Sequence, residues 1–185
     1  MGTPSGLETK FATFGTGLTV TDEAEITGYA SLFGVMDQGG DVVQRGAYAA
    51  SLRHLVAAGR RVKMLWQHDP TRPIGVWDEV REDDRGLFVK GRLLDATQTG
   101  REAAALVTAG AIDGLSIGYR TQRAEKDAKG NRLLTELDLW EVSLVTFPML
   151  PQARVAAKSD LPAVDKTLKS LADVLNGARR DLARR

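Results

Sequence analysis

Cysteine is missing from all 185 residues of this chain. Its absence excludes disulfide bonds, thiolate nucleophiles and cysteine-ligated zinc, and it suits a cytoplasmic protein. Long apolar runs are also missing, so we expect no transmembrane helix, and the N-terminus has no apolar segment of the kind found in secretory signals. A net charge of +1 gives no general electrostatic reason to expect nucleic acid or a membrane surface as a partner.

Histidine is almost as scarce, because the sequence contains only His54 and His68. Any reaction that needs an imidazole must therefore use one of them. The chain has no phosphate-binding glycine loop and no HExxH motif, and His68-Asp69 with a distant His54 is a poor set of metal ligands. We expect neither a nucleotide cofactor nor a metal ion.

The rest of the sequence indicates a β-rich α+β domain over residues 1–157. Alternation of apolar and polar residues predicts about seven strands, with helices at 47–59 and 97–111 and a glycine-rich connection at 38–46. The stretches "DDRG" and "DAKGN" are typical of hairpin turns, which favours a closed or strongly curved, mostly antiparallel sheet with flanking helices. In the first helix the expected buried face consists of Tyr48, Leu52, Leu55 and Val56.

Residues 158–185 are predicted to form a separate amphipathic helix. Seven apolar residues recur there at alternating spacings of three and four, which is a heptad pattern with a narrow apolar seam. Such a helix could pack back on the domain, but the narrow seam favours pairing with another helix, either its own copy or a partner. The seven residues are Leu161, Val164, Leu168, Leu171, Leu175, Ala178 and Leu182.

Two polar residues in apolar strands are the first candidates for chemistry. His68 ends the strand "VKMLWQH", where Pro70 is expected to stop it, so the side chain can reach a cleft. The ordinary explanation is a surface histidine in a turn, capped by Asp69. Ser116 lies in "GLSIGY", where flanking glycines let another backbone approach closely, as a substrate or oxyanion site requires. The alternative is a half-exposed serine on a strand.

Glu141 is the third candidate, a carboxylate in the apolar strand "LDLWEVSLVTF". Strand alternation puts it on the same face as Ser143. If that face is buried, an unpaired carboxylate is costly, and an imidazole N–H would satisfy it; Glu141 would then be the third member of a Ser-His-acid set. The alternative is an edge-strand glutamate in solvent, and Ser143 is a competing nucleophile. The sequence alone leaves open whether these residues converge.

Four blocks of the sequence resemble one known family. They are "ITGYASLFGVMDQGGDVVQRGAYAASL", "VKMLWQHDPTRPIGVW", "GLSIGYR" and "LWEVSLVTFPMLPQARV". Their order and spacing are similar to those of the caudoviral prohead proteases, the capsid-maturation serine proteases of tailed phages and related gene transfer agents. The resemblance covers about residues 25–157. It implies a β-barrel surrounded by helices, as in the herpesvirus assemblins.

The resemblance also implies a catalytic set. The family's histidine falls on His68, its serine on Ser116 and its acidic residue on Glu141. The herpesvirus relatives use a second histidine as third member, and His54 is the only other candidate, but it lies in a predicted helix outside the matching blocks. The implied reaction is acyl transfer from a peptide bond, with backbone N–H groups at residues 116–118 as candidate oxyanion donors.

The setting of the reaction is implied in the same way. The substrate would be the scaffold region of the major capsid protein, and the protease would also cleave itself. It would act in the host cytoplasm, inside the immature capsid or prohead, and its assemblin relatives are homodimers. Residues 158–185 would recruit it to a coiled-coil scaffold. The main alternative is a non-catalytic capsid scaffold or assembly protein with the same fold and tail; no motif supports a general hydrolase or esterase.

Overall fold

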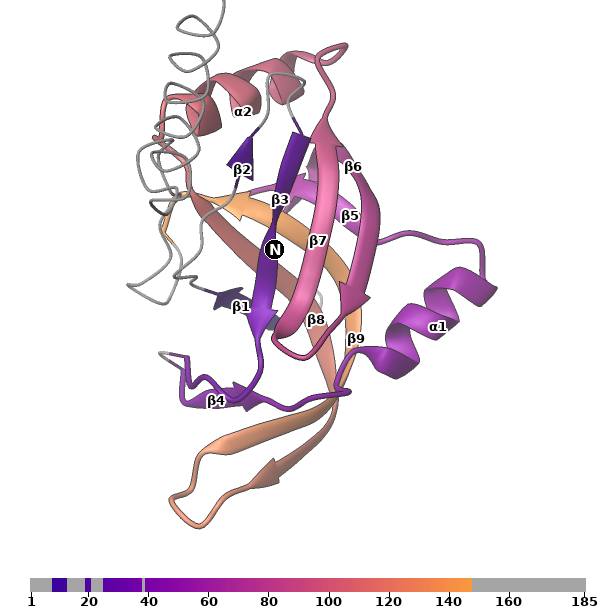
Figure 1. Ribbon diagram of the computed structural model, residues 1–185, viewed down its shortest axis with the longest axis vertical. Coiled ribbons are helices and arrows are strands. Elements are labelled where there is room, and N and C mark those ends of the chain that lie inside the picture. Colours follow the sequence, from indigo (N-terminus) through magenta and orange to yellow (C-terminus); the bar gives the residue numbers. More distant parts are fainter. Residues whose placement is uncertain (1–7, 13–18, 21–24, 38, 148–185) are drawn as a thin grey trace, which may run out of the picture. The chain divides into compact units, whose positions relative to one another are not determined.

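The computed structural model describes residues 8–12, 19–20, 25–37 and 39–147, which form nine strands and two helices (Figure 1). The helices are α1 (Ala49–Ala57) and α2 (Gln98–Thr108). The strands are β1 (Glu8–Ala12), β2 (Thr19–Val20), β3 (Glu25–Leu32), β4 (Asp41–Val43), β5 (Lys63–Trp66), β6 (Asp69–Glu82), β7 (Gly86–Leu93), β8 (Gly114–Lys126) and β9 (Arg132–Val145).

All nine strands belong to one sheet, whose hydrogen-bonded order is β1-β8-β9-β5-β6-β7-β3-β2, with β4 beside β9. Most neighbours are antiparallel, but β4 and β5 both run parallel to β9. The long strands curl into a half-barrel (Figure 1), which confirms the predicted strong curvature. Within the described residues the hydrogen-bonded path ends at β1 and β2, so closure into a complete barrel stays a prediction.

The two faces of β8 and β9 carry different side chains, because residues alternate along a strand. Leu115 and Ile117 on β8, and Val142 and Leu144 on β9, are almost fully buried in the apolar core. Trp77 of β6 joins the same core, and its indole N–H donates a hydrogen bond to the carbonyl of Val142 at 3.2 Å. The residues between these apolar positions therefore face the other side of the sheet, where the candidate site lies.

Helix α1 follows the fully buried Tyr48, and Gly59 lies just beyond its C-terminal end, with a φ of 61° that suits a glycine after a helix. Ser51 and Leu55 are its buried residues. Val56 is 80% exposed, so the predicted buried face is wrong at this position. The helix is rotated toward Ser51 because the Ser51 hydroxyl accepts a hydrogen bond from the Leu139 N–H of β9 at 2.9 Å.

Helix α2 begins where the sequence predicts it. The Thr97 hydroxyl accepts a hydrogen bond from the Gly100 N–H at 3.0 Å, as an N-cap threonine does. Gly110, at a φ of 71°, follows the C-terminal end of the helix. Neither described helix is long and apolar enough to cross a membrane.

Three features of the sheet differ from the sequence-based expectation. Strand β4 lies within residues 38–46, predicted to be a connection, because it pairs with the distant strand β9. The two-residue strand β2 is also not predicted. Pro70 does not stop a strand: β5 ends earlier, at Trp66, and β6 begins at Asp69 and continues through Pro70. The pairing of β5 with β6 is irregular there, which spares the ladder hydrogen bond that proline cannot donate.

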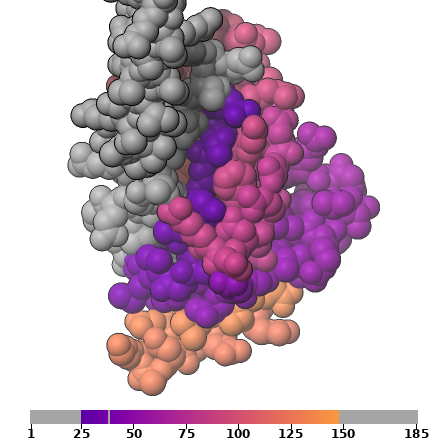
Figure 2. Space-filling model, viewed as in Figure 1, coloured from indigo at the N-terminus to yellow at the C-terminus, as the bar shows by residue number. Residues whose placement is uncertain are grey.

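Both predicted hairpins are confirmed. The longer one joins β8 to β9 through a turn in which the Asp127 carboxylate accepts hydrogen bonds from the N–H groups of Lys129 and Asn131, at 2.8 and 2.9 Å. Its tip, orange in Figure 2, lies against the purple segment that contains β4. The predicted tail, residues 158–185, and its boundary at residue 157 lie outside the described residues.

Candidate active site

His68 lies in a two-residue turn between β5 and β6. Gln67 and His68 have φ angles of 52° and 61°, in the left-handed region that non-glycine residues seldom adopt. Such strain persists only where the surrounding structure imposes it, and it is often found at functional sites. The reversal is so tight that Trp66 pairs with Asp69.

Strand β9 and Thr146, the residue directly after it, supply the groups that hold this turn. The Gln67 N–H donates to the carbonyl of Leu144 at 2.9 Å, and the Gln67 side chain exchanges two hydrogen bonds with Thr146. The His68 N–H donates to the Ser143 hydroxyl at 3.2 Å. These contacts are available because β5 runs beside β9 in parallel, so that its end reaches the last residues of β9.

Ser116 is the third residue of β8, directly opposite Ser143 of β9. Its side chain has no exposed surface. The Ser116 Oγ is 2.6 Å from Nε2 of His68, whose own side chain is 18% exposed. The expected serine and histidine are therefore in hydrogen-bond contact, and Ser116 is not the half-exposed strand serine of the alternative interpretation.

Glu141 completes this set of contacts from β9. It is 5% exposed, and its Oε1 lies 2.6 Å from Nδ1 of His68. Its other oxygen, Oε2, accepts a hydrogen bond from the Ser143 hydroxyl at 2.5 Å. The solvent-exposed alternative for Glu141 is thus wrong, and the buried carboxylate has a hydrogen-bond partner on each oxygen.

Gly118 leaves the space that the Glu141 carboxylate occupies. It is the cross-strand partner of Glu141, and a Cβ at this position would overlap Oε1 and the carboxyl carbon. The sequence predicts that glycines beside Ser116 admit a substrate backbone. In the structure Gly118 instead admits the acidic side chain that contacts His68.

Asp69, His54 and the amides of residues 116–118 do not take the roles that the sequence suggested for them. Asp69, the expected cap of a surface histidine, uses its carboxylate on the N–H and hydroxyl of Thr71, at 2.9 and 2.6 Å. These hydrogen bonds, the hydroxyl first, lower the pKa of Asp69. His54 is an exposed residue of α1, and the side chain that contacts Nδ1 of His68 is Glu141. The amides of residues 116–118 lie between two strands, β9 and β1, so they face sheet neighbours rather than an open groove.

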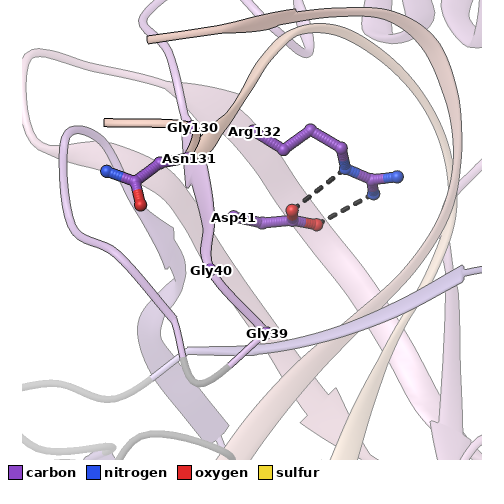
Figure 3. Close-up of a pocket in the computed structure, with 6 residues that line it drawn as sticks. All are labelled: Gly39, Gly40, Asp41, Gly130, Asn131 and Arg132. Carbon is purple, nitrogen blue, oxygen red and sulfur yellow. Dashed lines mark hydrogen bonds and ion pairs between the residues drawn. The ribbon is translucent and has the colours of Figure 1, made fainter. Parts of the chain in front are cut away.

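A hollow of about 440 Å³ lies elsewhere, at the junction of β4 with the β8–β9 turn (Figure 3). Asp41 and Arg132 line it and form a two-pronged ion pair at 3.0 and 2.8 Å. None of the three candidate catalytic residues lines this hollow, and we assign its ion pair to joining β4 to β9. Among the described residues, no group of three His, Asp or Glu side chains could hold a metal ion.

A family model of the caudovirus prohead serine proteases matches residues 15–169. The chain belongs to this family. The matched range contains His68, Ser116 and Glu141, the three residues that the fold brings into contact.

Two phage proteins are related to this family member in sequence. It is 30% identical over 155 residues to the prohead protease of Enterobacteria phage HK97, which covers 82% of this chain and 66% of that protein. It is 29% identical over 104 residues to a capsid polyprotein of Pseudomonas phage PAJU2, which covers 52% of this chain and 15% of that protein. The chain thus spans just under two thirds of the first relative and a small part of the second.

The fold is similar to that of the capsid assembly protease of bacteriophage T4. The TM-score is 0.62 at 14% sequence identity, and the match covers 77% of this chain and 98% of the T4 chain. At this identity the likeness concerns the fold alone. The β-rich half-barrel is therefore an architecture that this prohead-protease family member shares with a phage capsid protease.

The sequence names Ser143 only as a competing nucleophile and gives no role to Gln67 and Thr146. The contacts of Ser143 with Glu141 and with the His68 backbone are not predicted, nor is the pairing of Gln67 with Thr146. One signal was available for Ser143, because it lies two residues from Glu141 on the same strand face. No comparable signal exists for Gln67, since its contacts depend on the parallel pairing of β5 with β9.

Proposed function

We propose that this chain is the serine endopeptidase of capsid maturation, which cleaves the scaffold region of the major capsid protein and itself inside the prohead, in the host cytoplasm. One observation carries the proposal: the Ser116 hydroxyl, the His68 ring and the Glu141 carboxylate form a continuous series of contacts, each 2.6 Å. Membership of the prohead serine protease family supports it. The names of the two relatives, a prohead protease and a capsid polyprotein, support a capsid protein as the substrate.

The domain organisation is part of the same proposal. Residues 1–157 would form the protease domain. Residues 158–185, with their heptad pattern, would be the tail that recruits the protease to a coiled-coil scaffold, and a homodimer would match the assemblin relatives.

The proposed mechanism follows from the direction of the hydrogen bonds. A carboxylate can only accept, so the contact with Glu141 assigns the ring proton to Nδ1, and Nε2 of His68 then accepts the hydrogen bond of the Ser116 hydroxyl and can act as a base. Nε2 accepts the Ser116 proton as Oγ attacks the carbonyl carbon of the scissile peptide bond. Glu141 holds the ring in this orientation and stabilises the imidazolium that forms.

The second half of the reaction restores the enzyme. The imidazolium gives its proton to the leaving amine, and the peptide C–N bond breaks to leave an acyl group on Ser116. Water then loses a proton to His68 and attacks this ester, which releases the new carboxyl terminus and returns the proton to Ser116. No cofactor is required at any step.

Access to the nucleophile is the main physical demand of this proposal. Ser116 has no exposed surface, whereas a substrate must bring its carbonyl carbon to Oγ. Strand β1 also pairs with β8 along the edge beside Ser116. Cleavage therefore requires a rearrangement that uncovers Oγ.

The test compares the wild type with Ser116→Ala, each co-expressed with the major capsid protein, by the intact masses of both proteins. We expect the wild type to shorten the capsid protein and itself, and Ser116→Ala to leave both whole, because loss of the nucleophile lowers turnover by about 10⁶-fold in a triad enzyme. Ser31→Ala is the matched control: Ser31 is another buried strand serine, 1% exposed, but it lies in β3.

Two further outcomes would change the conclusion. If both proteins stay whole with the wild type in well-assembled shells, the non-catalytic scaffold protein is the better interpretation. If Ser116→Ala still cleaves, the chain is a peptidase with another nucleophile.

A second variant tests the role of Glu141. Glu141→Gln keeps the size of the side chain and removes its charge, and it should lower cleavage about 10⁴-fold if Glu141 acts as the third triad member.

A further inference from the structure

Ser143 is the polar residue of this site that the proposed mechanism does not use. Its side chain has no exposed surface, and it lies across the β8–β9 ladder from Ser116. The sequence presents it as a competing nucleophile. In the structure its hydroxyl contacts the Glu141 carboxylate and the His68 backbone, whereas the His68 Nε2 lies against Ser116.

Both hydrogen-bonding functions of the Ser143 hydroxyl are engaged. It donates to Oε2 of Glu141 at 2.5 Å and accepts from the backbone N–H of His68 at 3.2 Å. A serine hydroxyl has one proton to donate, so this proton is committed to the carboxylate. The hydroxyl thus joins the two groups that determine where the His68 ring lies: the carboxylate on Nδ1 and the backbone that carries the ring.

The backbone contact matters because the turn is strained. Gln67 and His68 both have left-handed φ angles, 52° and 61°, without being glycine. Such a conformation persists only when surrounding contacts impose it. Ser143 supplies the acceptor for the second of these two residues, the one whose side chain must reach Ser116.

The carboxylate contact matters because a carboxylate can rotate. With Oε2 held by Ser143, Oε1 is the oxygen left to face Nδ1 of His68. Gly118 leaves room for the carboxylate in this orientation. A hydrogen bond on each oxygen fixes the plane of the carboxylate, and with it the plane of the imidazole.

We propose that Ser143 is a positioning residue of this site, which locks Glu141 and the His68 turn together so that Nε2 points at Ser116 in the resting enzyme. The inference rests on the proposed peptidase function. It predicts that loss of the Ser143 hydroxyl slows the chemical step while substrate binding persists.

The experiment uses the full chain and a peptide that spans a junction cut by the wild type. We expect Ser143→Ala to lower kcat about 10- to 100-fold with little change in KM, because small displacements of reacting groups have effects of this size. Ser143→Thr, which keeps the hydroxyl, should recover much of the loss. Ser31→Ala, a buried serine of β3, is again the control, and thermal unfolding verifies that each variant is folded.

A second measurement needs no turnover. The proton on Nδ1 of His68 should give a downfield resonance in the proton NMR spectrum, since it lies in a short, part-buried contact of 2.6 Å with Glu141. In Ser143→Ala this resonance should shift upfield or broaden by exchange. A merely structural serine would change the unfolding temperature and leave the resonance of the folded protein in place.

The outcomes separate this inference from the function it rests on. If Ser143→Ala keeps the wild-type kcat and the His68 resonance, Ser143 has no positioning role. The proposed peptidase function still stands in that case, provided that Ser116→Ala is inactive. If an organophosphorus reagent labels Ser143 in the wild type, Ser143 is a nucleophile and the inference is overturned. If Ser116→Ala cleaves as fast as the wild type, the proposed mechanism fails first.

Discussion

Two tight turns lie at the two ends of β6, and their backbone N–H groups are satisfied in different ways. In the turn at the C-terminal end, the Asp83 carboxylate accepts hydrogen bonds from the N–H groups of Arg85 and Gly86, at 2.8 and 3.2 Å, while Tyr29 and Arg45 also reach the turn from other elements. The turn at the N-terminal end contains Gln67 and His68, and their N–H groups bond to β9, more than 70 residues further along the chain.

The difference follows from what each turn must do. An aspartate with a glycine three positions later satisfies the N–H groups of a hairpin turn with local hydrogen bonds, and the contacts from Tyr29 and Arg45 add to them. The His68 turn has no glycine and two left-handed residues, so a distant strand has to impose it. The same strand, β9, carries Glu141, so one element both shapes the turn and supplies the acid that contacts its histidine.

The largest effect expected from this comparison is that of Gly118→Ala. The added methyl group would overlap Oε1 of Glu141, so the carboxylate must leave Nδ1 of His68. We expect peptide cleavage to fall about 100-fold or more, because the ring loses the group that orients it. Steady-state rates on the junction peptide measure this, with circular dichroism as the check of folding.

Gly86→Ala is the matched control in the other turn. A methyl group there would overlap the backbone carbonyl of Ser31, so this variant should also be strained and less stable. Its folded fraction should nevertheless cleave at the wild-type rate. Equal losses of rate in the two variants would mean that general destabilisation, rather than displacement of Glu141, explains the effect of Gly118→Ala.

The same comparison explains what the sequence could predict. "DDRG" and "DAKGN" contain the chemistry of their turns, so both hairpins were predicted correctly. Strand β4 was missed because its pairing with β9 joins residues some 90 positions apart. Val56 was misplaced because a hydrogen bond from β9 to Ser51 sets the rotation of α1.

The candidate site shows the same division between local and distant information. His68, Ser116 and Glu141 were named from motif order, and the fold brings them into contact. The hydrogen bonds from Ser143 and Thr146 to the turn of Gln67 and His68 could not be predicted, since they require β5 to run parallel to β9. Residue types indicate which groups can react, whereas strand pairing determines which groups hold them.

A medium effect, on stability alone, is expected for Asp83→Asn. Burial opposes ionisation of Asp83, but hydrogen bonds from Tyr29 and from the N–H groups of Arg85 and Gly86 outweigh it and lower its pKa to about 2. A carboxylate whose pKa is lower in the folded state stabilises the fold above its unfolded pKa of about 3.9. We therefore expect Asp83→Asn to lower the free energy of unfolding by about 1 to 2 kcal/mol at neutral pH.

The pH dependence distinguishes this effect from a simple loss of packing. The contribution of Asp83 is lost as the pH falls from about 4 through about 2, so the wild type and the variant should converge in urea unfolding at low pH. Cleavage at neutral pH should not change, because the turn lies at the other end of β6. A stability difference that is constant between pH 7 and pH 2 would contradict the ionic origin.

The smallest effect is expected for Thr146→Val, which keeps the shape of the side chain and removes the acceptor of the Gln67 amide. Both residues are exposed, so water can replace the lost bond, and stability should change by less than about 1 kcal/mol. The turn of Gln67 and His68 nevertheless loses one of the hydrogen bonds that hold it, and we expect kcat to fall about 2- to 5-fold with KM unchanged.

Thr135→Val is the control for this prediction. It removes an exposed hydroxyl from the β8–β9 hairpin and should leave kcat unaltered. If both valine variants cleave at the wild-type rate, the contacts from Leu144 and Ser143 are enough to hold the turn. The hydrogen bond between Gln67 and Thr146 then has no part in positioning His68.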